Sequence, residues 1–156
     1  MAYKIFLPFV AKETKADDEL ENILFDLIYH SSYQRRIAMY QNVILWAAAQ
    51  KKADDMAQKN YFGHTSPSGL TANELVRGMG YELPDWYRAK DNNVESISVG
   101  GGKPETVAIA WLNSPGHRVH VYGEIDFYRE QQCVGIGRST ARDGRILTVF
   151  ISAICI

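Results

Sequence analysis

The sequence predicts an α+β fold or a layered α-β-α domain. Apolar residues recur at helical spacing over the first two thirds of the chain, and two β-type apolar runs follow near the C-terminus. Loops rich in glycine, serine and proline separate these segments. The 156 residues are the usual length of one compact domain, and they contain no internal repeat and no evident domain boundary.

Two amphipathic helices are predicted after an N-terminal arm of residues 1–18. The first runs from about residue 18 to residue 30, and we expect Asp17 or Asp18 to cap it, because a carboxylate accepts from the free N–H groups of a first helical turn. The second follows within residues 44–56, where three consecutive alanines favour helix. The apolar positions at helical spacing are Leu20, Ile23, Leu24, Leu27 and Ile28, and then Ile44, Ala47, Ala48 and Met56.

Shorter elements follow in the middle of the chain. Thr71 and Glu74 form a capping-box pattern that opens a helix ending near Gly78 or Gly80. Residues 83–93 are irregular, and residues 94–99 alternate weakly, as a strand does. Another helix begins at Pro104 and stops at residues 113–116, whereas residues 117–123 fit either a short helix or an extended turn.

The last third of the chain is β-type in composition and carries both cysteines. Strand-like runs cover residues 133–137 and 149–155. If they pair as a hairpin around residues 142–144, Cys133 and Cys155 fall close to opposite one another. A disulfide is then geometrically possible, and two buried free thiols are an equal alternative.

Composition and charge argue against a nucleic-acid-binding protein and against a membrane-spanning helix. The net charge of −1, with acidic and basic residues intermixed, argues against a nucleic-acid partner, which needs a basic stripe. No apolar run reaches the roughly 18–20 residues of a membrane helix. Residues 3–10 are apolar, but Pro8 interrupts them and they lack the pattern of a signal peptide. The remnant of a removed signal and a strand-like arm are both open interpretations of residues 1–10.

Two of the four histidines lie where binding groups are often found. His64 and His117 each occupy a loop rich in small residues beside a predicted helix. His117 and His120 have a spacing that could place two metal ligands on one helical face, although the second histidine of such a pair is more often a packing residue. The chain lacks the Gly-x-Ser-x-Gly and His-Glu-x-x-His patterns, so the commonest serine-hydrolase and zinc-protease signals are absent.

Five segments resemble, in the same order, the motifs of one family. They are the alanine-rich stretch 46–57, the loop Asn60-Tyr61-Phe62-Gly63-His64-Thr65-Ser66-Pro67-Ser68-Gly69, the run Asn93-Val94-Glu95-Ser96-Ile97, the block 110–118 and the run Cys133-Val134-Gly135-Ile136-Gly137. The loop around His64 and the block from Trp111 to Arg118 are the specific ones. On these residues the chain is identified as a member of the CAP superfamily (cysteine-rich secretory proteins, antigen 5 and plant pathogenesis-related proteins). It is most similar to the small bacterial members, with residues 19–156 as the CAP domain.

This resemblance implies a three-layer α-β-α sandwich with a central antiparallel sheet and a wide cleft. The family places two histidines and two glutamates in that cleft, and His64, Glu95 and His117 match them. Ser114 stands where animal and plant members have the second glutamate. The predicted ligand-binding cleft is therefore His64, Glu95, His117 and Ser114, with Glu95 as the candidate catalytic group. The resemblance also favours a bridge between Cys133 and Cys155 and a secreted, extracytoplasmic protein.

Three functions are compatible with such a cleft. We expect a monomeric binding module that receives a lipid, sterol, peptide or glycan, with any metal assisting recognition. The alternatives are a metal-dependent hydrolase or peptidase using His64, Glu95 and His117, and an extracellular structural or interaction protein with a vestigial cleft. His64 and His117 are the candidate ligands of a zinc ion, whose open position would hold water. The same three side chains could instead form a hydrogen-bonded cleft floor.

Overall fold

The computed structural model describes residues 16–156, and the predictions made for residues 1–15 lie outside them. Within the described part, the helices are α1 (Ala16–Tyr29), α2 (Val43–Lys59), α3 (Ala72–Gly78), α4 (Pro104–Asn113), α5 (Pro115–Val121) and α6 (Asp126–Arg129). The strands are β1 (Tyr40–Gln41), β2 (Glu95–Gly100), β3 (Cys133–Thr140) and β4 (Ile146–Ala153). None of these helices is long and apolar enough to cross a membrane.

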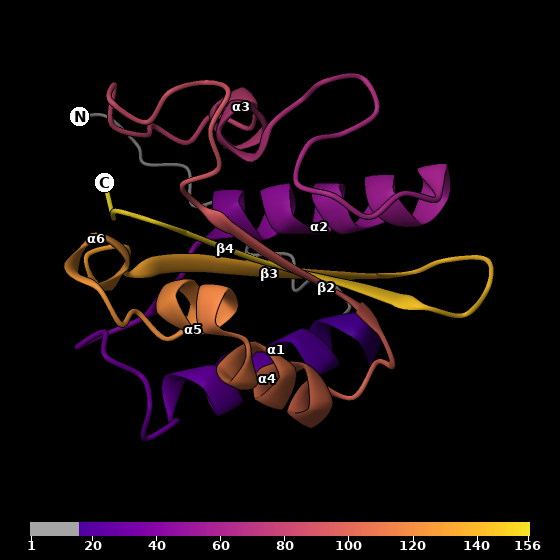
Figure 1. The fold of residues 1–156 in the computed structure, drawn as a ribbon, viewed down its shortest axis with the longest axis horizontal. Coiled ribbons are helices and arrows are strands. Elements are labelled where there is room, and N and C mark those ends of the chain that lie inside the picture. Colours follow the sequence, from indigo (N-terminus) through magenta and orange to yellow (C-terminus); the bar gives the residue numbers. More distant parts are fainter. Residues whose placement is uncertain (1–15) are drawn as a thin grey trace, which may run out of the picture.

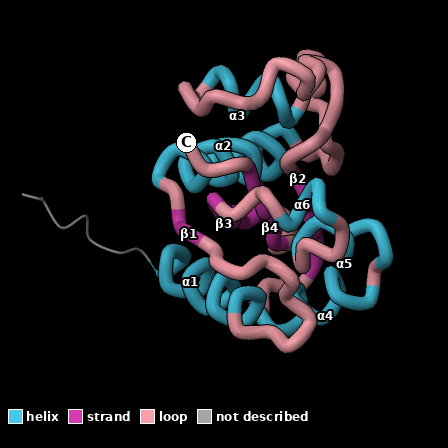
Figure 2. The backbone as a smooth tube through the Cα atoms, turned by 90° about the vertical axis from the view of Figure 1, so that its left-hand side faces the viewer, coloured by secondary structure: helices cyan, strands magenta, loops and turns pink. Residues whose placement is uncertain are grey.

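The elements form three layers, with helices on both faces of one sheet. In Figure 1, α2 and α3 lie on one side of the sheet, and α1, α4 and α5 lie on the other. The view turned by 90° in Figure 2 shows the same three layers. The strand order is β1-β3-β4-β2; the pairs β3–β4 and β4–β2 are antiparallel, and the two residues of β1 pair in parallel with β3. The predicted α-β-α sandwich is therefore confirmed.

Alternation along β4 divides the interior into two apolar clusters. Successive side chains of a strand point to opposite faces of its sheet. Val149 and Ile151 pack in the cluster on the α2 side, together with Leu45 of that helix. Phe150 packs in the other cluster, with Trp111 of α4. A residue of β2 paired with a residue of β4 shares its face, so this alternation also decides which layer each β2 side chain meets.

Helix α2 lies directly on the backbone of β3 at two glycines. A Cβ atom at Gly135 would overlap the backbone of Leu45 and Trp46, and one at Gly137 would overlap that of Ala49 and Gln50. Only hydrogen fits at these two positions, so the glycines let the helix approach the sheet. This close approach fixes α2 and, with it, the loop that follows its C-terminus.

Most predicted elements are present, and one cap is corrected. The capping box at Thr71 and Glu74 is formed, and the ambiguous segment 117–123 is mostly helical, because Pro115 occupies the first turn of α5. Ala16, Asp17 and Asp18 all lie inside α1, so the prediction that Asp17 or Asp18 caps this helix is wrong.

The hairpin of β3 and β4 brings the two cysteines together. Cys133 pairs with Ala153 in the sheet, and Cys155 follows two residues later. A disulfide joins Cys133 to Cys155, with their Cα atoms 5.1 Å apart, and the described residues contain no free cysteine. The bridge ties the end of the chain to the start of β3.

Candidate functional site

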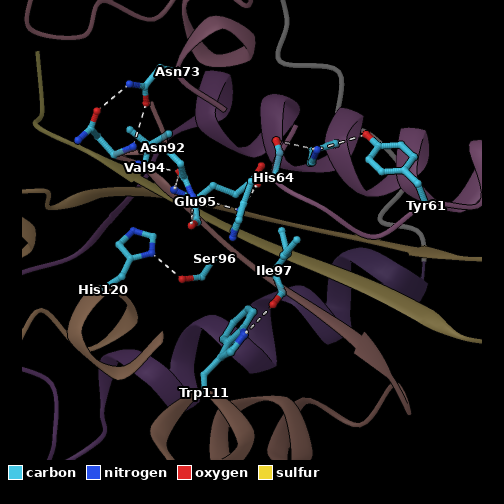
Figure 3. Close-up of polar contacts among 12 residues, drawn as sticks. Tyr61, His64, Asn73, Asn92, Val94, Glu95, Ser96, Ile97, Trp111 and His120 are labelled. Atoms are coloured by element: carbon cyan, nitrogen blue, oxygen red, sulfur yellow. Dashed lines mark hydrogen bonds and ion pairs between the residues drawn. The ribbon is translucent and has the colours of Figure 1, made fainter. Parts of the chain in front are cut away.

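Strand β2 carries the predicted carboxylate at the edge of the sheet. Glu95 is paired with Ile151, and Ser96 is paired with Phe150. Glu95 therefore faces the layer of α2, and Ser96 faces the layer of α4 and α5. Because β2 is an edge strand, side chains from both helical layers can reach it, as the close-up in Figure 3 shows for His64 and Trp111 on either side of it.

His64 and Glu95 are in direct contact across the site. His64 Nδ1 lies 2.8 Å from Glu95 Oε1. The carboxylate side chain is fully buried, whereas 45% of the His64 side chain is exposed. The second carboxylate oxygen, Oε2, is also buried, and no described residue offers it a hydrogen bond. An exposed imidazole thus covers a buried carboxylate that has one oxygen unpaired.

The neighbours of His64 determine which ring nitrogen carries the proton. Asn92 Nδ2 lies 3.1 Å from the same Nδ1 atom. An amide N–H can only donate, so Nδ1 can either accept from Asn92 or donate to Glu95. The bond to the carboxylate is charge-assisted and stronger. We therefore assign the proton to Nδ1, which leaves the lone pair of Nε2 as an acceptor.

The loop that carries His64 is held from below by α2. Asn60 ends that helix in the left-handed conformation, with φ 53°, and turns the chain back over it. Lys52 is buried, and its Nζ donates to the backbone carbonyl of His64 at 3.0 Å and to the Tyr61 hydroxyl at 3.2 Å. Tyr61 in turn donates to Asp55 Oδ2 at 2.6 Å. These contacts hold the His64 loop against α2 and so fix its position relative to β2.

Asn92 holds the other side of the pair. Its Oδ1 accepts from the backbone N–H of Glu95 at 2.9 Å, and its Nδ2 donates to the Glu95 carbonyl at 3.0 Å. Asn73 of α3 anchors the same segment by accepting from the Asn93 N–H at 3.1 Å (Figure 3). Lys52 and Asn92 were not predicted from the sequence. The signal for Asn92 was available, because asparagine often binds the backbone two or three residues on.

His117 reaches β2 from the opposite layer. It lies in α5, and its Nδ1 is 2.9 Å from Ser114 Oγ. Burial lowers the pKa of His117, the nearby charge of His64 lowers it further, and a hydrogen bond with the Ile97 backbone opposes this shift. Ser114 is thus the hydrogen-bond partner of His117 and lies on its own side of the strand. The structure brings His64 and Glu95 together, and His117 and Ser114 form a separate pair.

His120 lies in a buried polar network that the sequence analysis did not predict. Its Nδ1 is 2.7 Å from Ser96 Oγ and its Nε2 is 2.8 Å from Ser152 Oγ. Ser152 donates its single proton to Gln131 Oε1, so Nε2 of His120 must be the donor to Ser152, and Nδ1 accepts from Ser96. Burial, followed by the charge of Arg36, holds the pKa of His120 well below its usual range. The ring is therefore neutral, with a fixed tautomer.

The predicted zinc ligands His64 and His117 are not joined by a third ligand from the described residues. Among residues 16–156, no three His, Cys, Asp or Glu side chains are grouped so that they could hold a metal ion. His64 uses Nδ1 for Glu95, and His117 uses Nδ1 for Ser114. His120 is occupied on both nitrogens by serines. Nε2 of His64 and of His117 is left available by these contacts, but two histidine nitrogens are fewer than the three protein ligands of a catalytic zinc site, so these donors alone do not fit a resident zinc ion.

A pocket of about 230 Å³ adjoins His64 on the side of α2. It lies between the second half of that helix and the loop after it. Its lining residues are Lys51, Lys52, Asp55, Lys59, Tyr61, His64, Ser66, Ser68, Leu70, Thr71 and Leu75. Most of these side chains end in polar groups, while the lysine stems, the Tyr61 ring, Leu70 and Leu75 make much of the wall apolar, so the hollow beside the His64–Glu95 pair suits a ligand with both polar groups and apolar faces.

Comparison with known proteins places this fold and site in context. The profile of the cysteine-rich secretory protein family (CAP) matches residues 38–151. The uncharacterized protein YkwD of Bacillus subtilis (strain 168) is 35% identical over 74 residues, which cover 47% of this chain and 26% of that protein. This chain therefore matches only about a quarter of the length of that relative.

Two solved structures share the fold at low sequence identity. An outer surface protein from Borrelia burgdorferi superposes with a TM-score of 0.59 and 18% identity, covering 88% of each chain. An extracellular protein containing an SCP domain, from Bacillus anthracis str. Ames, superposes with a TM-score of 0.61 and 21% identity, covering 86% of this chain and 41% of that one. With the family profile matched over residues 38–151, the chain belongs to the cysteine-rich secretory protein (CAP) family.

Proposed function

We propose that this protein is an extracytoplasmic binding protein that recognises a polar organic ligand through the His64–Glu95 pair, without a resident metal ion. The observation that carries the proposal is the 2.8 Å contact between a fully buried carboxylate and a half-exposed imidazole. Burying a carboxylate is unfavourable unless it is paired and hydrogen-bonded. Here the buried Glu95 carboxylate holds the solvent-facing imidazole of His64 in one orientation.

The orientation of the ring defines what His64 can recognise. With its proton on Nδ1, His64 presents the lone pair of Nε2 and accepts a hydrogen bond from a ligand hydroxyl or amide. Peptides and glycans carry such donors along their length. Together with the charged and hydroxyl groups that line the adjacent pocket, this favours a peptide or a glycan over a lipid or a sterol.

Two observations support a location outside the cytoplasm. The disulfide between Cys133 and Cys155 belongs to an oxidising environment. The two structural relatives are described as an outer surface protein and an extracellular protein. The absence of three grouped metal ligands among the described residues supports the part of the proposal that concerns metal.

A hydrolase is the second candidate, and one feature favours it. A carboxylate that holds Nδ1–H leaves Nε2 free to accept a proton, as in the histidine of a catalytic triad. Turnover of peptide or ester substrates that is lost in His64→Ala would support this candidate over simple binding. Substrate that stays intact while it remains bound supports the binding protein.

The proposal is tested by amide chemical shifts of the 15N-labelled protein. Three probes represent the ligand classes: a trisaccharide of N-acetylglucosamine, an alanine tripeptide and palmitate. We expect the glycan or the peptide to shift the amides of His64 and Glu95, and palmitate to leave them unchanged. Glu95→Gln should weaken this binding at least tenfold, or about 1.4 kcal/mol.

Glu105→Gln is the matched control, because Glu105 is an exposed carboxylate in the first turn of α4. It should bind the probe as the wild type does. If palmitate alone shifts the two amides, or if both glutamine variants lose binding equally, the proposed recognition by the His64–Glu95 pair is wrong.

A further inference from the structure

The pocket beside His64 has an unbalanced charge. We call it the lysine pocket, because Lys51, Lys52 and Lys59 line it and Asp55 is the only acidic residue in its lining. Asp55 is already engaged: Lys59 Nζ lies 2.6 Å from its Oδ1, and the Tyr61 hydroxyl lies 2.6 Å from its Oδ2. Within residues 16–156, neither Lys51 nor Lys52 forms an ion pair. The pocket therefore presents two lysines without a carboxylate partner.

Lys52 is the innermost of these charges. It is only 4% exposed, and a lysine so deeply buried is normally paired. Its ammonium group has three N–H donors, of which two reach the Tyr61 hydroxyl and the His64 carbonyl. The third has no acceptor among the described residues. Burial lowers the pKa of Lys52, and the charges of Glu95 and Asp55 oppose the shift. An anion bound in the pocket would supply the missing acceptor and a countercharge in direct contact with the ammonium group.

Hydroxyl groups also line the pocket. Ser66 Oγ and Ser68 Oγ are 2.9 Å apart, and Ser66 also accepts from the Leu70 N–H at 3.0 Å. Serine hydroxyls both donate and accept, as the hydroxyls of a sugar do. The volume of about 230 Å³ is below the roughly 300 Å³ at which pockets for drug-sized ligands begin. It suits one sugar ring or one charged headgroup rather than an acyl chain.

We propose that the lysine pocket binds an acidic sugar, with its carboxylate or phosphate group on Lys51 and Lys52 and its hydroxyls on Ser66 and Ser68. Both kinds of oxyanion offer the acceptors that an ammonium group needs, and lysine acts on either as a point charge. His64 lines the same pocket, so the acidic sugar would be one residue of the polar ligand that the His64–Glu95 pair recognises. In that respect the inference rests on the proposed function.

The test compares four probes by titration of the full chain, followed through the amide shifts of residues 51, 52 and 61–70. Glucuronate and glucose 6-phosphate carry the two oxyanions, glucose is their neutral counterpart, and inorganic phosphate lacks the sugar. We expect one of the acidic sugars to bind at least tenfold more tightly than both glucose and phosphate. The acidic sugar that binds more tightly identifies the oxyanion.

Two variants, each with a matched control, test the lysines. Lys52→Met removes the buried charge, and Lys51→Glu reverses an exposed one that makes no hydrogen bond within the described residues, so the second variant keeps the fold if the first does not. Lys103 is exposed, precedes α4 in the other layer and lies outside the pocket lining. We expect Lys51→Glu and Lys52→Met to weaken binding at least tenfold, and Lys103→Glu and Lys103→Met to leave it unchanged.

The outcomes separate this inference from the proposed function. Binding of acidic sugar that survives Glu95→Gln but is lost in Lys51→Glu supports the pocket and contradicts the role of the His64–Glu95 pair. Three results would each overturn the assignment of the pocket to an acidic sugar. The first is that glucose binds as tightly as both acidic sugars, and the second is that inorganic phosphate does so. The third is that the Lys51 and Lys103 variants lose binding equally.

Discussion

His64 Nδ1 lies 2.8 Å from Glu95 Oε1, although the two residues come from different elements and lie 31 positions apart in the chain. Glu95 opens the edge strand β2, and His64 lies in the loop after α2. One partner is fully buried and the other is 45% exposed. The pair therefore links a buried carboxylate to an imidazole at the surface. The predictions below test this pair and the structure around it.

The first prediction concerns the tautomer of His64. In the neutral form of the ring, His64 should carry its proton on Nδ1, because Glu95 accepts there. Glu95→Gln replaces the carboxylate by a neutral amide and should shift the population toward Nε2–H. Long-range 1H–15N correlation spectra report both states. His120 is the internal control, because it should remain Nε2–H in both proteins. A wild-type His64 protonated on Nε2 would contradict the assignment.

The second prediction concerns stability against pH. The pKa of His120 in the folded protein lies well below its usual range, so the unfolded chain takes up a proton at this residue first as the pH falls. The free energy of unfolding should therefore decrease below about pH 6.5, by up to about 1.4 kcal/mol per pH unit for this group. His117, whose pKa is also lowered, adds to the same trend.

His120→Gln tests this directly, because an amide can accept from Ser96 and donate to Ser152 but does not titrate. Urea unfolding at a series of pH values between about 5 and 8 should show a shallower fall in the variant than in the wild type. Identical slopes for the two proteins would mean that His120 is not the group that couples stability to pH.

The third prediction concerns the contact between α2 and β3. Gly137→Ala would drive a methyl group into the backbone of Ala49 and Gln50, and backbone cannot yield as a side chain does. We expect a loss of about 3 kcal/mol or more in the free energy of unfolding, measured by urea denaturation. Gly78→Ala is the control, because nothing lies within 4 Å of its added Cβ; its effect should stay within about 1 kcal/mol. A tolerated Gly137→Ala would show that the helix does not rest on this strand.

The fourth prediction concerns the disulfide. Cys133 and Cys155 are separated by 22 positions, and a loop of that length restricts the unfolded chain by about 3 kcal/mol in the chain-entropy account. The double variant Cys133→Ser/Cys155→Ser should lose about that amount. Reductant should destabilise the wild type by a similar amount and leave the variant unaffected. Insensitivity of both proteins to reductant would contradict a structural role for the bridge.

The fold was predictable from sequence where a local pattern decides the structure. Helical spacing predicted α1 and α2, and the Thr71–Glu74 pattern predicted a capping box that the structure contains. That Asp17 and Asp18 lie inside α1 was missed, because helix starts depend on which of several adjacent polar residues the chain uses as a cap. The segment of α5 was ambiguous because its seven residues are too few to establish a helical period.

The site was predictable only in part, because its geometry depends on which of the two helical layers each side chain belongs to. His64, Glu95 and His117 were recognised by resemblance to a family, and the spacing of these residues says nothing of their geometry. That His64 and His117 approach β2 from opposite layers follows from strand order, which is a long-range property. In the sequence, Lys52 cannot be told from any other lysine on an amphipathic helix. Its role depends on the loop after α2, which folds back so that Lys52 donates to the His64 carbonyl.

The central claim is that His64 and Glu95 form a ligand-recognition pair rather than part of a zinc centre, and a zinc titration by calorimetry tests it most directly. The wild type is compared with His64→Ala/His117→Ala. We predict that neither protein binds zinc one-to-one at micromolar concentration, because the described residues group no three metal ligands and two histidine nitrogens alone fall short of a zinc site. Tight binding of one zinc ion by the wild type that disappears in the double variant would contradict the account.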